Sequence, residues 1–241
     1  MPRPGPFVLA LAGLCASCAI PIIGAHGAER AHERRSRGSA LTLHAERPDV
    51  PATAERCYAE LEGAGVRFQR VAAGRAHGVQ MPLQLAGPVG GVAVWPRGRK
   101  AIHGILDCRL ALRLVSWAPS LRRARVTGLE HYSIYRPGAR TPRRGRVSGH
   151  ARGLAIDAAR FHLESGEVVD VLSDWEDRGR GDAPCPQRSD EAAPSRLLRG
   201  VVCEAVEQRL FSVVLTPHHD RAHHNHVHLE LKPEVSWTYV R

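Results

Sequence analysis

Residues 148–157 read SGHARGLAID, and residues 223–228 read HHNHVH. The first stretch supplies an imidazole, His150, and a carboxylate, Asp157, in an H-x6-D spacing, and the second supplies imidazoles at alternate positions. Two histidines and one aspartate are a typical ligand set for a catalytic zinc ion that keeps one position open for water. The two stretches therefore favour a metallohydrolase.

The segment Leu154 to Ala159 predicts a buried strand, because it is short, apolar and preceded by a glycine. Side chains alternate across a strand, so Asp157 shares a face with Ala155 and Ala159, whose small side chains leave room for an ion. A carboxylate inside such a strand costs free energy unless it is paired or bound to a metal. The alternative is an aspartate that closes a buried hydrogen bond.

The segment His226 to Leu231 alternates strictly and predicts a second strand. Its valine and leucines face the core, and His226, His228 and Glu230 share the other face. Two histidines at this spacing can converge on one centre. The alternatives are an exposed polar face or a chance cluster in a chain with 14 histidines. The H-x6-D motif in the same chain favours the metal site.

The remaining pattern predicts an α+β fold: a small mixed or antiparallel sheet carries a zinc cleft and is flanked by helices. Helices are expected from the Thr53 cap to residues 63–65, from the Asp107 cap to just before Pro119, and over residues 195–211. Further strands are expected over residues 66–68, 81–85, 92–95 and 126–135. Because no βαβ repeat is present, a doubly wound sheet is disfavoured.

The length of 241 residues suits one domain, alone or with a tail. The net charge of +10 favours contact with anionic polymers such as cell wall, phospholipid surfaces or nucleic acid. No helix-turn-helix, zinc-finger or aromatic-stacking motif supports nucleic-acid binding, so we do not expect it.

The N-terminus is typical of a secretory signal peptide over residues 1–25. A basic Arg3 precedes an apolar run from Phe7 to Ile23, and Gly24 and Ala25 offer a cleavage site. The run is short for a membrane span, so stable membrane insertion is not expected. The alternatives are an uncleaved anchor and, less favoured, a lipoprotein. Residues 26–50 predict a flexible linker, and residues 51–241 the folded domain.

Four cysteines remain after removal of the signal: Cys57, Cys108, Cys185 and Cys203. An even number in an exported protein indicates two disulfides, and three pairings are possible. The pairs Cys57–Cys108 and Cys185–Cys203 are favoured, because each flanks one half of the domain. The expected location is secreted, periplasmic or in the bacterial cell envelope.

The two motifs together resemble the zinc peptidases that cut D-amino-acid bonds in peptidoglycan. That superfamily includes the D-alanyl-D-alanine carboxypeptidases and dipeptidases and the penicillin-insensitive murein endopeptidase. Within it, the chain is most similar to the bacterial extensin-like C-terminal domain family, over roughly Ala54 to Leu231. The similarity extends to Tyr135-Arg136 and to the helices that carry Cys57, Cys108 and Cys203.

The resemblance implies that His150, Asp157 and His228 are the zinc ligands. His226 would act beside the ion as general base or transition-state stabiliser, and His223 completes the H-x-x-H-x-H pattern.

The resemblance also implies that Arg136 polarises the scissile carbonyl, with a surface arginine as the alternative. Ser148 would bind substrate or order its loop. Family members commonly have glutamate between the serine and histidine of the first motif, where this chain has Gly149.

The implied activity is hydrolysis of amide bonds in peptidoglycan peptides by a monomeric, zinc-dependent carboxypeptidase or endopeptidase. The alternative is a non-catalytic envelope-binding module that retains the fold.

Overall fold

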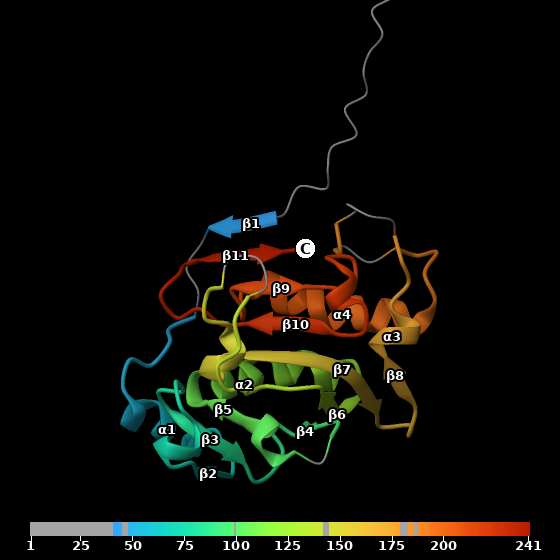
Figure 1. Ribbon diagram of the computed structural model, residues 1–241. Helices are drawn as coiled ribbons and strands as arrows, with labels where there is room; N and C mark the ends of the chain where they lie inside the picture. The colour runs from blue at the N-terminus through green and yellow to red at the C-terminus, as the bar shows by residue number, and fades with distance from the viewer. Residues whose placement is uncertain (1–40, 45–47, 99, 142–144, 179–182, 186–187) are drawn as a thin grey trace, which may run out of the picture. The chain divides into compact units, whose positions relative to one another are not determined.

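The two motif-bearing segments form neighbouring strands of one sheet in the computed structural model (Figure 1). Strand β7 (Ala155–Leu163) pairs antiparallel with β10 (Val227–Glu230), and the register places His228 directly opposite Asp157. The structure describes residues 41–44, 48–98, 100–141, 145–178, 183–185 and 188–241. The predicted signal peptide and most of the predicted linker lie outside these residues.

Among the described residues, the main sheet has eight strands in the order β1-β11-β9-β10-β7-β6-β4, with β8 also paired to β7. The other strands of this sheet are β1 (Leu41–His44), β4 (Ala93–Pro96), β6 (Val126–His131), β8 (Val168–Asp170), β9 (Val213–Leu215) and β11 (Trp237–Val240). The β4–β6 and β9–β11 pairs are parallel and the remaining pairs are antiparallel, so the sheet is mixed.

A second, antiparallel sheet is formed by β2 (Phe68–Arg70), β3 (Pro82–Leu85) and β5 (Ile105–Asp107). The α-helices of the described chain are α1 (Ala54–Gly63), α2 (Cys108–Arg123), α3 (Val171–Asp174) and α4 (Ala193–Glu207). Short 3₁₀ helices are η1 (Ala73–Arg75), η2 (Ala101–Gly104), η3 (Gly149–Arg152) and η4 (Arg221–His223). The α+β prediction is confirmed, and the main sheet is larger than expected.

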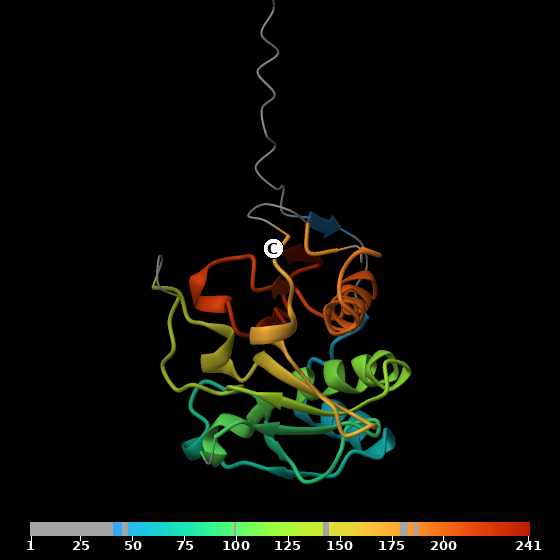
Figure 2. The ribbon, with the colours of Figure 1, turned by 90° about the vertical axis from the view of Figure 1, so that its right-hand side faces the viewer.

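The helices α2 and α4 cover one face of the main sheet, and η3 lies on the other side (Figure 2). Trp117 of α2 packs edge-to-face against Phe161 of β7 and against Phe211, with ring centroids 6.2 and 5.9 Å apart. Its indole N–H donates to the Val201 carbonyl of α4 at 2.8 Å. On the same face, Ile156 and Leu229 are fully buried. Asp157 and His228 therefore point to the face that these helices leave uncovered.

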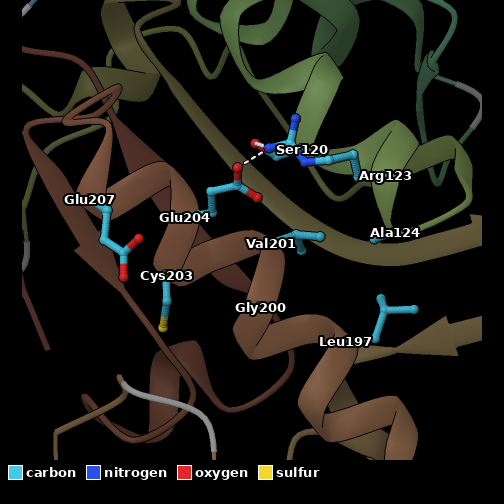
Figure 3. A pocket seen from close by; sticks show the side chains of 9 residues that line it. All are labelled: Ser120, Arg123, Ala124, Leu197, Gly200, Val201, Cys203, Glu204 and Glu207. Atoms are coloured by element: carbon cyan, nitrogen blue, oxygen red, sulfur yellow. Dashed lines mark hydrogen bonds and ion pairs between the residues drawn. The ribbon is translucent and has the colours of Figure 1, made fainter.

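A pocket lies between α2 and α4 (Figure 3). Its lining includes Arg123 and Glu204, which form an ion pair across it. None of the predicted metal-binding or catalytic residues lines this pocket, whereas the disulfide cysteine Cys203 does.

The predicted end of the second helix is wrong. Helix α2 continues through Pro119 to Arg123. Proline inside a helix removes one hydrogen bond. Here Pro119 is exposed, while Trp117 and Leu121 on either side are buried in the core. Burial of these side chains outweighs the lost hydrogen bond.

Other boundaries also differ from the sequence prediction. Strand β2 begins at Phe68 rather than at residue 66, and β4 and the start of α4 are shifted by one or two residues. Strand β6 ends at His131 rather than at residue 135, where its register with β7 shifts. Helix α4 ends at Glu207 rather than at residue 211, just before Arg209 takes a positive φ of 53°. Strand β7 extends beyond Ala159 to Leu163, because β8 pairs with its second half.

Part of the predicted linker is a strand. Leu41–His44 form β1, which pairs antiparallel with β11 at the edge of the main sheet. A strand at the edge of a sheet pairs through backbone hydrogen bonds, so the pattern of apolar side chains in the sequence hardly indicates it. The linker prediction is therefore wrong for these four residues.

The structure contains the disulfides Cys57–Cys108 and Cys185–Cys203, the same two pairs that the sequence favoured. The first joins α1 to the start of α2, and the second joins α4 to the segment before it. Disulfides are typical of proteins that fold in an oxidising compartment outside the cytoplasm. No helix in the described part of the chain has the length and apolar character needed to cross a membrane.

Candidate metal centre

His150 is placed by the tight turn of η3. The Ser148 hydroxyl accepts from the His150 backbone N–H at 3.3 Å and starts the turn, so Ser148 orders this loop. Gly153 ends the turn with φ +63°, and a Cβ there would lie 2.9 Å from the Asp107 backbone nitrogen. Only glycine fits this conformation and this close approach without strain. The serine and glycine of the motif thus position the histidine over β7.

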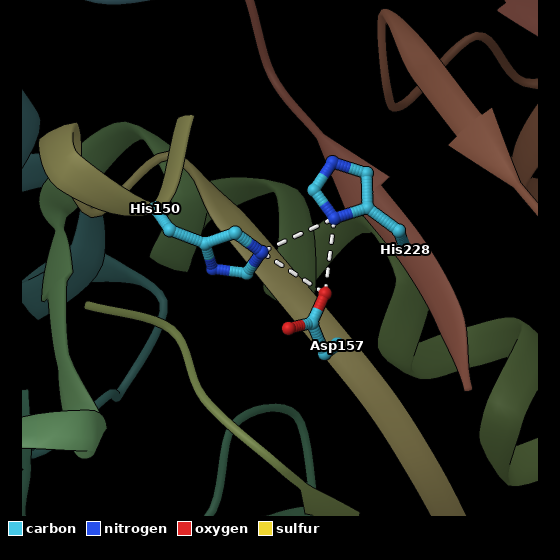
Figure 4. A group of neighbouring side chains, drawn as sticks. All are labelled: His150, Asp157 and His228. Carbon is cyan, nitrogen blue, oxygen red and sulfur yellow. Dashed lines mark hydrogen bonds and ion pairs between the residues drawn. The ribbon is translucent and has the colours of Figure 1, made fainter. Parts of the chain in front are cut away.

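Three ligand atoms converge above the sheet (Figure 4). Asp157 Oδ1 lies 3.0 Å from His150 Nε2 and 3.0 Å from His228 Nδ1, and the two nitrogens are 3.2 Å apart. All three side chains are buried, with exposed fractions of 1% for His150, 4% for Asp157 and 7% for His228. The structure therefore brings together the three residues that the resemblance implied as ligands.

Each of these side chains is oriented by a partner on its far side. His150 Nδ1 donates to the Ile134 carbonyl at 2.8 Å, and His228 Nε2 faces Glu230 Oε2 at 3.4 Å. Ser133 donates to the other Asp157 oxygen at 3.2 Å. When both imidazoles are neutral in these tautomers, each directs a lone pair toward the position of Asp157 Oδ1. Partners of this kind are typical of metal-ligating histidines and carboxylates.

The group fits a metal ion. Tetrahedral ligands about 2.0–2.1 Å from zinc lie roughly 3.3 Å from one another, close to the observed separations. Nitrogen and carboxylate donors suit zinc and related first-row ions. Two lone pairs and a carboxylate also repel one another in a buried space unless a cation or a proton lies between them.

The electrostatics of this group favour a bound proton when no metal is present. Burial lowers the pKa of His228, but its hydrogen bonds to Asp157 and Glu230 outweigh burial and raise the pKa to about 9. Burial raises the pKa of Asp157, yet its contacts with the imidazoles of His150, His226 and His228 hold the pKa well below its usual range. Metal binding must therefore displace a proton, which couples metal affinity to pH.

His226 lies beside the three candidate ligands but is not one of them. Its Nε2 is 3.3 Å from Asp157 Oδ1, and its Nδ1 faces Asn225 Oδ1 at 2.8 Å. The amide of Asn225 in turn donates to the Tyr132 hydroxyl at 3.1 Å. This chain of contacts leaves His226 Nε2 directed toward the centre, where it can accept a proton.

The structure places Arg136 and His223 at the edge of the centre. The Arg136 backbone N–H donates to the His150 carbonyl at 3.0 Å, and its side chain is exposed. The guanidinium is close enough for its charge to contribute to the lowered pKa of His150, of which burial is the main cause. The His223 ring lies 5.2 Å from the His226 ring and 5.8 Å from the His228 ring.

Glu230 and Ser133 are site residues that sequence motifs did not assign. The alternation of the last strand placed Glu230 on the histidine face, but it gave no sign that this carboxylate contacts His228. A Cβ at Gly149 would lie 2.7 Å from Glu230 Cγ. Gly149 in the first motif therefore makes room for Glu230. Ser133 lies beyond the end of β6, where no local pattern marks it.

The α+β fold and the buried His–Asp–His group define a protein with a candidate metal centre. The family model described as Extensin-like protein C-terminus matches residues 55–241, and the chain belongs to this family. No curated protein and no solved structure matches the chain.

Proposed function

We propose that this chain is an exported, zinc-dependent hydrolase of amide bonds in peptidoglycan peptides. The observation that carries the proposal is the convergence of His150 Nε2, Asp157 Oδ1 and His228 Nδ1, with His226 directed at the same point. Three protein ligands with a further position open are typical of catalytic zinc, whereas structural zinc sites have four. The family resemblance supplies the substrate class.

In this proposal, some residues hold the metal ion and another transfers protons. His150, Asp157 and His228 would hold the ion, and Ser133, Glu230 and the Ile134 carbonyl keep them oriented. When bound, zinc supplies a Lewis acid that polarises a carbonyl and lowers the pKa of water.

His226 Nε2 accepts a proton as water attacks and returns it to the leaving amine, while Asn225 keeps its Nδ1 proton in place. Arg136, exposed at the rim, binds the substrate carbonyl. The buried ligands and the open rim together suit a substrate that enters from solvent.

The disulfides support a location outside the cytoplasm. Two disulfides are typical of an oxidising compartment, and peptidoglycan is found there in bacteria. The positive net charge of +10 favours association with the anionic cell wall. We propose that the chain acts there as a monomer.

The test is to incubate the purified protein, with and without zinc, with peptidoglycan fragments and to identify the products by mass spectrometry. We expect zinc-dependent loss of an amino acid or cleavage of a peptide cross-link, and the product identifies the bond. If the zinc-loaded protein binds the fragments but never cleaves them, the chain is an envelope-binding module instead.

A further inference from the structure

A second group of metal-binding side chains lies on the segment between β9 and β10. It consists of His219, Asp220 and His223, which each offer one ligand atom within 4.8 Å of the others. The two histidines are half-buried and the aspartate is exposed. An ion and its water ligands can therefore reach this group from solvent, in contrast to the buried inner group.

The Asp220 carboxylate lies between the two imidazoles. Its Oδ1 is 2.6 Å from His223 Nδ1, and its Oδ2 is 3.6 Å from His219 Nε2. The backbone N–H groups of Ala222 and His223 donate to Oδ1 at 2.9 and 3.2 Å, where η4 begins. The backbone thus holds the carboxylate in place, and a ligand that is already positioned binds an ion with less ordering.

His223 connects this outer group to the inner centre. Its ring lies 5.2 Å from the ring of His219 on one side and 5.2 Å from that of His226 on the other. It also lies 5.8 Å from the ring of His228. The outer group therefore borders the same side of the centre as His226.

We propose that His219, Asp220 and His223 form a second, weaker site for a divalent cation of the zinc class. Two imidazoles and a carboxylate are donors that suit such ions. The cation would replace the contacts that now join both histidines to Asp220. Binding is weaker than at the inner centre because the donor atoms are spread more widely and water competes for them. The inference concerns metal binding alone and does not depend on hydrolysis.

The test is equilibrium dialysis of the metal-free full chain against zinc, with the bound ions counted by elemental analysis. We expect two ions per chain, one tight and one weak. His219→Asn and Asp220→Asn should each weaken binding of the second ion by at least about 10-fold. Loss of a group that only hydrogen-bonds to a metal ligand already reduces metal affinity by about this factor. Asparagine at 220 can still accept the backbone hydrogen bonds that begin η4.

The matched control is His224→Asn. His224 is an exposed histidine of the same segment whose Nδ1 contacts the Arg221 carbonyl, and it stands outside the group. This variant should bind both ions as the wild type does. If His224→Asn lost the weakly bound ion as fully as the two site variants do, the ion would be bound non-specifically by a histidine-rich segment. That result would overturn the proposal.

A second comparison separates the two sites. An ion at the inner centre should be lost in His228→Ala but kept in Asp220→Asn. An ion at the outer site should show the opposite behaviour in the same two variants. A wild type that binds a single ion, unaffected by His219→Asn and Asp220→Asn, contradicts the outer site.

Discussion

The candidate ligand His228 receives its orientation from Glu230 and its position from the register of β10 with β7. Because three ligands share one ion, loss of any one should remove most of the binding. We expect wild-type protein to hold about one tightly bound zinc per chain and His228→Ala to hold none at that site. Elemental analysis after dialysis checks this, and full tight occupancy in the variant would rule out His228 as a ligand.

His226 should act on turnover rather than on metal binding. Its Nε2 lies near Asp157 Oδ1, but the candidate ligands are three other side chains. His226→Ala should keep tightly bound zinc and lose about 10²–10⁴-fold in rate, the typical contribution of a positioned acid–base group. Product formation from peptidoglycan fragments is the measurement, with His224→Ala as the control. Wild-type turnover in His226→Ala would remove this residue from the mechanism.

Glu230 should act on metal affinity through His228. Replacing the carboxylate by an amide keeps the shape and removes the charge that faces His228 Nε2. Glu230→Gln should therefore weaken zinc binding by about 10–100-fold, which is typical when a hydrogen-bond partner of a metal ligand is replaced. Competition with a chelator measures the affinity. Glu234→Gln is the control, because Glu234 is exposed and pairs only loosely with Arg152, at 4.0 Å. Equal affinity in the two variants would contradict the role of Glu230.

At the scale of elements, the two disulfides should differ in how much they stabilise the fold. Cys57–Cys108 closes a separation of 51 residues and Cys185–Cys203 one of 18. The chain-entropy model gives about 4 kcal/mol for the first and about 3 kcal/mol for the second. Replacing both cysteines of one pair by alanine should lower the free energy of unfolding, and the loss should be larger for Cys57–Cys108 than for Cys185–Cys203. Unfolding in urea measures both values.

Alkylation of the exported protein provides the independent check on these pairs. We expect no reaction at Cys57, Cys108, Cys185 and Cys203 without reductant, and complete reaction with it. Free thiols at these four positions in the native protein would contradict the pairing.

The elements also show where local sequence predicts structure well. Helix α1 begins after Thr53 and α2 after Asp107, because in both cases the side chain accepts a hydrogen bond from the first turn. The ends of α2 and β6 could not be predicted in this way. Burial around Pro119 extends the helix, and a shift of register with β7 ends the strand.

At the scale of the whole molecule, stability should fall on mild acidification because of His131. This residue is 1% exposed, and burial outweighs the attraction of Asp157 to lower its pKa to about 3. In the unfolded chain the pKa is about 6.5, so the unfolded state takes up the proton first as the pH falls. The contribution of neutral, buried His131 to the free energy of unfolding is fully present above about pH 6.5. It is lost progressively as the pH falls toward 3, and the loss is at most about 5 kcal/mol.

The measurement is the free energy of unfolding from pH 7 to pH 3 for wild type and His131→Gln, both free of metal. Glutamine does not titrate, so the variant should lose less stability over this range. Parallel curves for the two proteins would show that His131 does not titrate as its burial requires.

The sequence by itself determined which residues could bind a metal. The H-x6-D motif and the alternating histidines supplied the candidates, because ligand chemistry and strand periodicity are local properties of the chain. The family resemblance then implied His150, Asp157 and His228 among them. The same holds for the α+β class and for the core faces of β7 and β10, which follow from the alternation of apolar and polar residues.

Only the tertiary structure decided how these residues meet. The register that sets His228 opposite Asp157, the room that Gly149 leaves for Glu230 and the contact from Ser133 join segments far apart in the chain. The edge pairing of β1 with β11 likewise depends on backbone hydrogen bonds that side-chain patterns do not record. Such features arise from packing between distant segments, and for that reason the sequence predicted the candidate ligands but not the contacts that orient them.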